Sequence, residues 1–159
     1  NREIDAHQLG VDQVILLFAK RLDDNSLHFA RHRLADLFLD TFTYNASTTA
    51  IDALCSGVPV LTYSGKDFVS RICATHVTNV GLDDMICRTT KEFEDRAIYF
   101  ATNEHALKEV RKRLVMNLRT EPLFNIPRFV SHLEDAYQRM WRQYLSGELP
   151  QNFNVESLA

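Results

Sequence analysis

Residues 37–54 carry the sequence LFLDTFTYNASTTAIDAL. Its three leading apolar residues are typical of a short buried strand, and a small polar turn follows them. Consecutive hydroxyl residues then open a helical pattern, with Asp52 one turn further in. Backbone N–H groups at a helix start attract phosphate, and the helix dipole adds to that attraction. The stretch therefore predicts a strand, a turn and a helix arranged to hold a nucleotide diphosphate.

Side chains at this helix start could reach the same ligand. Thr48 and Thr49 can donate hydroxyl hydrogen bonds to phosphate, and Asp52 can accept hydrogen bonds from ribose hydroxyls. A plainer alternative is that Ser47 or Thr48 caps the helix, while Asp52 interacts favourably with the helix dipole. The stretch alone leaves both interpretations open.

Short apolar runs alternate with helical patterns along the rest of the chain. We expect strands at residues 14–18, 37–39, 60–62 and 77–80. We expect helices at residues 3–9, 26–33 with Ser26 as its cap, 50–56, 68–75, 91–101, 105–118 and 128–145. This alternation predicts an α/β fold, a Rossmann-like parallel sheet with helices on both faces, which binds ligands at the carboxyl ends of its strands.

The size and charge of the chain are those of an ordinary globular domain. Its 159 residues allow one domain with a core, expected over residues 1–147, followed by a poorly ordered polar tail at residues 148–159. The net charge of -3 gives no general attraction to nucleic acid or to anionic membranes. Because the chain begins without Met, we expect it to be a piece of a longer protein.

The three cysteines, Cys55, Cys73 and Cys87, match no metal or redox spacing. We expect them to be reduced and mostly buried, which favours a cytoplasmic location. No apolar run approaches the length that a membrane span needs.

A cluster of basic residues precedes residues 37–54 in the sequence. Lys20 and Arg21 follow the first expected strand, and His28, Arg31 and His32 share one helical face. These groups could hydrogen-bond a base or neutralise a diphosphate. Taken alone, a solvated helix end explains them better. His28 and His32 also have a zinc-binding spacing, but no third ligand is evident, so we predict no metal site.

Two further features follow in the sequence. Gly65, in the loop after the third strand, would let a ligand approach the backbone, with Ser70 or Arg71 facing it. The last helix carries an apolar stripe that is wide for one small domain, so we expect it to pack on a part of the protein outside this chain. The stripe comprises Phe129, Leu133, Ala136, Tyr137, Met140, Trp141 and Tyr144.

Several motifs, in order, resemble the O-linked N-acetylglucosamine (O-GlcNAc) transferases, in particular their bacterial relatives. They are RHRLADLFLDTF at residues 31–42, YN at 44–45, TT at 48–49 with Asp52, GVPVLT at 57–62 and SR at 70–71. PLFN at 122–125 and the last helix with its Trp141 resemble the C-terminal end of the family. The resemblance implies a GT-B enzyme, two Rossmann-like halves with the sugar nucleotide between them, of which this chain is the C-terminal, UDP-binding half.

The resemblance also implies which residues lie near the nucleoside. By position, Ala19 would offer backbone groups to the uracil, and Arg21 takes the place of a basic residue near the nucleoside. His28 and Arg31 fall on positions at the base and ribose side.

For the rest of the donor, the resemblance places Thr48 and Thr49 on the diphosphate and Asp52 on the ribose. Ser47 stands where the animal enzyme has His and many bacterial relatives have Gly, and Thr43 replaces a common Pro. The family uses no metal and no cofactor, because positive side chains and helix N-termini stabilise the leaving diphosphate.

The resemblance therefore implies the UDP-sugar-binding half of a transferase that moves N-acetylglucosamine from UDP-GlcNAc to Ser or Thr of proteins. The family's catalytic Lys, its acceptor-side His and its tetratricopeptide repeats belong before residue 1, so we expect no catalytic residue here and an inactive isolated chain. The expected partners are the UDP-sugar, the missing N-terminal half with its repeats, and a protein acceptor. The alternatives are a GDP-fucose-dependent O-fucosyltransferase, a UDP-glucose-dependent N-glucosyltransferase of the same fold, or a non-catalytic interaction module that docks through its aromatic stripe.

Overall fold

A computed structural model of the chain describes residues 17–156. Its centre is a parallel sheet in the order β1-β2-β3, formed by β1 (Phe38–Leu39), β2 (Val60–Tyr63) and β3 (Ile86–Cys87). Phe38 pairs with Val60, and Thr62 pairs with Ile86. All three strands run the same way, so their carboxyl ends meet at one edge.

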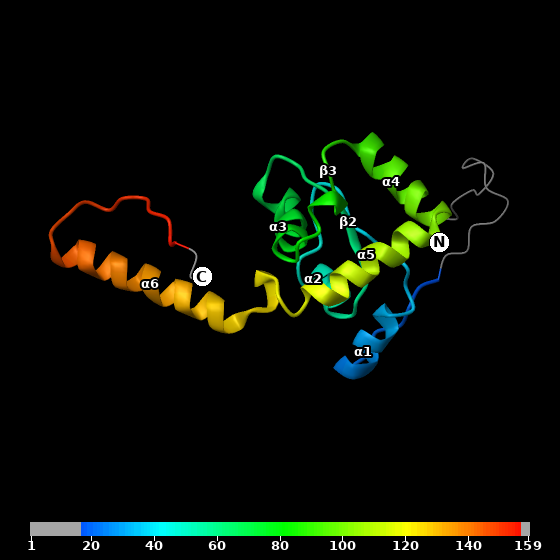
Figure 1. The fold of residues 1–159 in the computed structure, drawn as a ribbon, viewed down its shortest axis with the longest axis horizontal. Helices are drawn as coiled ribbons and strands as arrows, with labels where there is room; N and C mark the ends of the chain where they lie inside the picture. Colours follow the sequence, from blue (N-terminus) through cyan, green and yellow to red (C-terminus); the bar gives the residue numbers. More distant parts are fainter. Residues whose placement is uncertain (1–16, 157–159) are drawn as a thin grey trace.

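Helices connect and cover these strands (Figure 1). They are α1 (Asn25–His32), α2 (Thr48–Cys55), α3 (Ile72–Asn79), α4 (Thr90–Thr102), α5 (Glu104–Asn117) and α6 (Ile126–Leu145), with 3-10 turns η2 (Phe68–Ser70), η3 (Asp83–Met85) and η4 (Pro122–Phe124). Helices α2, α3 and α4 pack against the central strand β2. Leu54, Leu61 and Leu114, from α2, β2 and α5, are fully buried in the core. The predicted Rossmann-like α/β fold is therefore confirmed.

Two of the predicted elements around α3 are wrong. Residues 77–80, expected as a strand, form the last turn of α3 and its C-cap. Val77 and Val80 are fully buried at helical i, i+3 spacing, so the apolar run reflects one helix face rather than a strand. The helix expected at 68–75 is interrupted at Arg71, where η2 ends and α3 begins.

Two predictions at the start of the described chain also need correction. Leu17 and Phe18, expected in a buried strand, belong to no strand and are 88% and 91% exposed. The rest of that expected strand and the helix at 3–9 lie outside the described residues. Asp24, not Ser26, caps α1: its Oδ1 accepts the backbone N–H of Ser26 at 2.7 Å.

The cysteines are free, but they do not share one environment. Cys73 and Cys87 are buried, whereas Cys55 is exposed. Burial raises the pKa of the Cys87 thiol to about 11 and that of Cys73 further still. The prediction of burial holds for two of the three cysteines, and none of the three forms a disulfide within the described residues.

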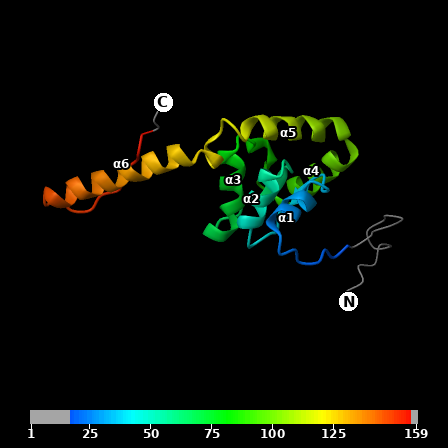
Figure 2. The ribbon, with the colours of Figure 1, turned by 90° about the horizontal axis from the view of Figure 1, so that it is seen from below.

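Helix α6 extends away from the sheet and its covering helices (Figure 2). None of its side chains is buried, and the stripe residues Phe129, Trp141 and Tyr144 are 61%, 59% and 73% exposed. The residues after it return along the helix, where Arg139 donates a hydrogen bond to the carbonyl of Asn154 at 3.0 Å. Within residues 17–156, no helix combines the length and apolarity that crossing a membrane demands.

Candidate functional site

The turn after β1 is built around a buried carboxylate. Asp40, 5% exposed, accepts backbone N–H groups of Thr41 and Ala46 at 2.8 and 2.7 Å through Oδ1. Its Oδ2 accepts the hydroxyl of Thr62, on the neighbouring strand, at 2.6 Å. Asn45, also buried, donates to the carbonyl of Thr41 at 2.9 Å. These bonds fix the turn at the carboxyl edge of the sheet and so fix where α2 begins.

The start of α2 is open to solvent. Ser47 is the N-cap, but its side chain makes no capping hydrogen bond, while its carbonyl accepts the N–H groups of Ala50 and Ile51, each at 3.1 Å. Thr48 and Thr49 are exposed. The plain capping interpretation of these hydroxyls therefore fails for Ser47, and the exposed helix start carries the partial positive charge that attracts anions.

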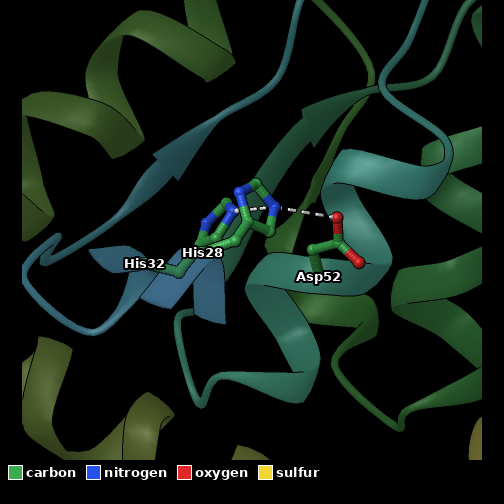
Figure 3. A group of neighbouring side chains, drawn as sticks. All are labelled: His28, His32 and Asp52. Carbon is green, nitrogen blue, oxygen red and sulfur yellow. Dashed lines mark hydrogen bonds and ion pairs between the residues drawn. The ribbon is translucent and has the colours of Figure 1, made fainter. Parts of the chain in front are cut away.

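Helix α1 brings its basic face against α2 (Figure 3). His28 Nε2 lies 3.2 Å from Oδ2 of Asp52, although 24 residues separate the two. His32 Nε2 lies 3.3 Å from the same His28 nitrogen. Arg31 places Nη2 at 3.3 Å from His28 Nδ1 and donates through Nη1 to the carbonyl of Lys20 at 2.6 Å.

These contacts select one arrangement of protons on His28. A guanidinium only donates, so Nδ1 of His28 accepts from Arg31. Its Nε2 then carries the hydrogen and donates to the carboxylate of Asp52. Burial, followed by the neighbouring His28, lowers the pKa of His32, while Asp52 opposes them. The cluster thus holds a guanidinium, a carboxylate and two imidazoles close together on a half-buried surface.

The predicted donor residues fall into two groups in the structure. Asp52 stands at i, i+4 from Thr48 and i, i+3 from Thr49, so these three share one side of α2, next to His28 and Arg31. Ser47 begins the same helix.

Ala19 and Arg21 form the second group, in an exposed segment without helix or strand. Arg21 pairs with Asp23 at 3.5 Å, with both side chains more than 90% exposed. Ala19 precedes Lys20, whose carbonyl receives Arg31. The roles of all eight residues in donor binding stay predictions.

The loop after β2 is used internally rather than for a ligand. Gly65 donates its N–H to the carbonyl of Ser70 at 2.8 Å, and a Cβ on Gly65 would lie 2.3 Å from Ser70 Oγ. Ser70 is itself buried, and its hydroxyl bonds to the backbone of Asp67. The glycine is needed for this close contact, so Ser70 does not face a ligand. The other residue expected to do so, Arg71, is exposed and stays a prediction.

Sequence reasoning missed the residues that hold the site in place. Asp40, Asn45 and Thr62 are buried polar groups with no direct part in the predicted ligand contacts. A signal was present, since an Asp directly after an apolar strand, followed by a polar turn, is typical of a side chain that accepts backbone N–H groups.

Comparisons with known proteins support the fold and the C-terminal placement. A family model described as "Glycosyl transferase family 41" matches residues 2–133. An Arabidopsis thaliana protein named "Probable UDP-N-acetylglucosamine--peptide N-acetylglucosaminyltransferase SEC" is 37% identical over 131 residues, 82% of this chain and 13% of that protein. A Hordeum vulgare protein with the same description, SPINDLY, is 31% identical over 96% of this chain and 16% of its own length.

A solved structure is also similar to this chain. An O-GlcNAc transferase mutant of Thermobaculum terrenum matches with a TM-score of 0.69 and 33% identity, over 74% of this chain and 23% of that one. The chain thus spans less than a quarter of each of these three relatives.

Proposed function

The chain belongs to glycosyl transferase family 41, and from that premise we propose that it is the donor-binding part of a protein O-GlcNAc transferase. The donor is a UDP-sugar, UDP-GlcNAc, and the acceptors are Ser or Thr of proteins. The relatives named above are described as UDP-N-acetylglucosamine–peptide N-acetylglucosaminyltransferases, which supports this choice. The rest of the active site lies in parts of the protein outside this chain, so the isolated chain is inactive.

The contact between α1 and α2 carries the proposal. Thr48 and Thr49 are exposed and share one side of α2 with Asp52, and Asp52 contacts the basic face of α1 through His28. A nucleoside diphosphate needs these chemistries in this order: donors for the phosphates, an acceptor for the ribose hydroxyls and polar groups beside the base.

Each group has a defined part in holding the donor. The N–H groups at the start of α2, with the hydroxyls of Thr48 and Thr49, donate to the diphosphate. Asp52 accepts from the ribose hydroxyls, while His28 and Arg31 lie towards the base. As the sugar departs, negative charge grows on the diphosphate, and the fixed donors and helix dipole stabilise that charge without a metal or cofactor.

Calorimetry of the full 159-residue chain with UDP tests this proposal. We expect weak binding that falls at least about tenfold in D52A and in T48A, since each loses a hydrogen bond to a charged or polyhydroxyl ligand. D36A is the matched control, because the side chain of Asp36 is 84% exposed and belongs to a different surface. Equal UDP affinity in D52A, T48A and D36A would exclude this site.

Thermal shift with UDP and GDP separates the donor classes. Stabilisation by UDP alone supports a UDP-sugar, as in the proposed GlcNAc or the alternative glucose transfer. Stabilisation by GDP alone would favour the fucosyltransferase alternative. A chain stabilised by neither nucleotide would fit the interaction-module alternative instead.

A further inference from the structure

Three side chains that could bind a metal ion lie close together between α1 and α2. They are His28, His32 and Asp52, shown together in Figure 3. One ligand-type atom from each lies within 4.8 Å of the other two, and all three side chains are half-buried. Over residues 17–156, no other group of three or more His, Cys, Asp or Glu side chains approaches so closely.

Two of the three distances between these atoms match those in a zinc coordination sphere, and the third is no longer than 4.8 Å. Zinc binds imidazole nitrogen and carboxylate oxygen at about 2.0–2.1 Å in a tetrahedron, which puts neighbouring ligand atoms about 3.3 Å apart. His28 Nε2 lies 3.3 Å from His32 Nε2 and 3.2 Å from Asp52 Oδ2. Two histidines one helical turn apart and an acid from a second helix therefore provide three ligands and leave the fourth position open.

The sequence alone gave two residues at zinc-binding spacing, His28 and His32, but no third ligand nearby in the chain. Packing of α1 on α2 supplies Asp52 from 24 residues away. We propose that His28, His32 and Asp52 form a binding site for a divalent transition metal, with Zn²⁺ as the fitting ion. Since His28 and Asp52 are also proposed donor contacts, the metal competes with the nucleotide; this second part rests on the proposed function.

Arg31 disfavours the binding of a metal ion to His28. A histidine that binds zinc through Nε2 carries its hydrogen on Nδ1. His28 Nδ1 faces the guanidinium of Arg31 at 3.3 Å, where a second donor is unfavourable. Zinc binding therefore requires Arg31 to turn away, so the same cation that favours a diphosphate weakens the metal site.

The first experiment titrates Zn²⁺ into the full chain, without a histidine tag, by calorimetry. We expect one ion per chain and an affinity at least about tenfold lower in H32Q, which removes a ligand, with H105Q, an exposed histidine on α5, as control. R31Q raises zinc affinity and lowers UDP affinity. The absorption of Co²⁺ in place of Zn²⁺ provides a second readout, lost in H32Q.

Either of two results with the variants would overturn the site. Unchanged zinc affinity in H32Q, with the fold confirmed by circular dichroism, would show that His32 is not a ligand. A loss in C55S as large as in H32Q would place the metal at the exposed thiol of Cys55 instead.

The competition is measured with UDP at saturating Zn²⁺. We expect UDP affinity to fall at least about tenfold in the wild type and to be unaffected by zinc in H32Q. Direct complexes between zinc and UDP act equally on both proteins, so the difference reports the site. Zinc binding without any UDP binding would overturn the proposed function and keep the metal site, whereas UDP binding without zinc binding would do the reverse.

Discussion

Asp40 is the residue on which the geometry of the site depends most. D40A would remove the acceptor of the Thr62 hydroxyl and of two backbone N–H groups in a buried place. We expect it to lower the free energy of unfolding by about 2–4 kcal/mol, since buried donors left without partners are costly. Urea unfolding measures this.

The matched control for D40A is D36A, whose carboxylate is largely exposed and pairs with Arg111 at 3.8 Å. That change should stay within about 0.5 kcal/mol, as exposed ion pairs contribute little. Equal losses in the two variants would mean that the Asp40 hydrogen bonds do not hold the turn.

His76 makes stability depend on pH. It lies half-buried on α3, and within residues 17–156 its Nε2 has no hydrogen-bond partner. Burial lowers the pKa of its imidazole, and Asp40 only partly opposes this. Below about pH 6.5 the unfolded chain therefore takes up more protons than the folded one, so the free energy of unfolding decreases as the pH falls.

We expect the urea midpoint to be nearly constant above about pH 7 and to fall as the pH drops below about 6.5. H76Q removes one titrating group and makes that fall shallower. It does not abolish it, because the pKa of His32 is lowered too. H105Q, at an exposed position, is the control. A slope in H76Q identical to the wild type would contradict the prediction.

Among the elements, sequence periodicity predicted those whose local signal is strong. Helices α4, α5 and α6 were expected to within about two residues at each end, because their apolar residues repeat at helical spacing over several turns. Strand β3 was missed because two residues carry no period, and its place in the sheet comes from pairing with β2.

The candidate site also shows what sequence periodicity can and cannot predict. Helical spacing placed His28, Arg31 and His32 on one face, and this is confirmed by their contacts. The approach of His28 to Asp52 depends on how α1 packs against α2, which no local pattern encodes. The spacing of residues in the sequence therefore predicted which side chains share a helix face. Only the structure showed that the face of α1 contacts α2.

The turn between α3 and η3 offers a test of backbone geometry. Gly81 has φ +70°, and a Cβ there would lie 2.8 Å from Nδ2 of Asn117, which donates to the carbonyl of Val80 at 2.9 Å. G81A would impose left-handed strain and also displace Asn117. We expect a loss of about 2–4 kcal/mol in the free energy of unfolding.

A comparison with Gly57 separates the cost of the left-handed backbone from the cost of displacing Asn117. Its φ is +78°, but a Cβ would meet only Val115 Cγ2 at an ordinary 3.7 Å. G57A should therefore cost about 1–2 kcal/mol from conformation alone. Chemical denaturation of both variants compares them directly, and a G57A loss as large as that of G81A would show that Asn117 adds nothing.

At the scale of the whole molecule, the body around the sheet and α6 are energetically separable. No side chain of α6 is buried, whereas Leu123 and Phe124, just before it, pack against the core. Removal of residues 126–159 should therefore leave the melting temperature of the body within about 2 °C of that of the full chain. The helical circular dichroism signal should fall, because α6 contributes 20 helical residues.

The same deletion tests whether the stripe on α6 is exposed in solution. A dye that binds apolar surface should fluoresce with the full chain and with a variant lacking only residues 148–159, and lose that signal when 126–159 are removed. If α6 instead packed its stripe onto the body, the longer deletion would uncover apolar surface there. The melting temperature would then drop and dye binding would rise. The two deletions together thus decide whether the apolar face of α6 is free for contacts beyond this chain.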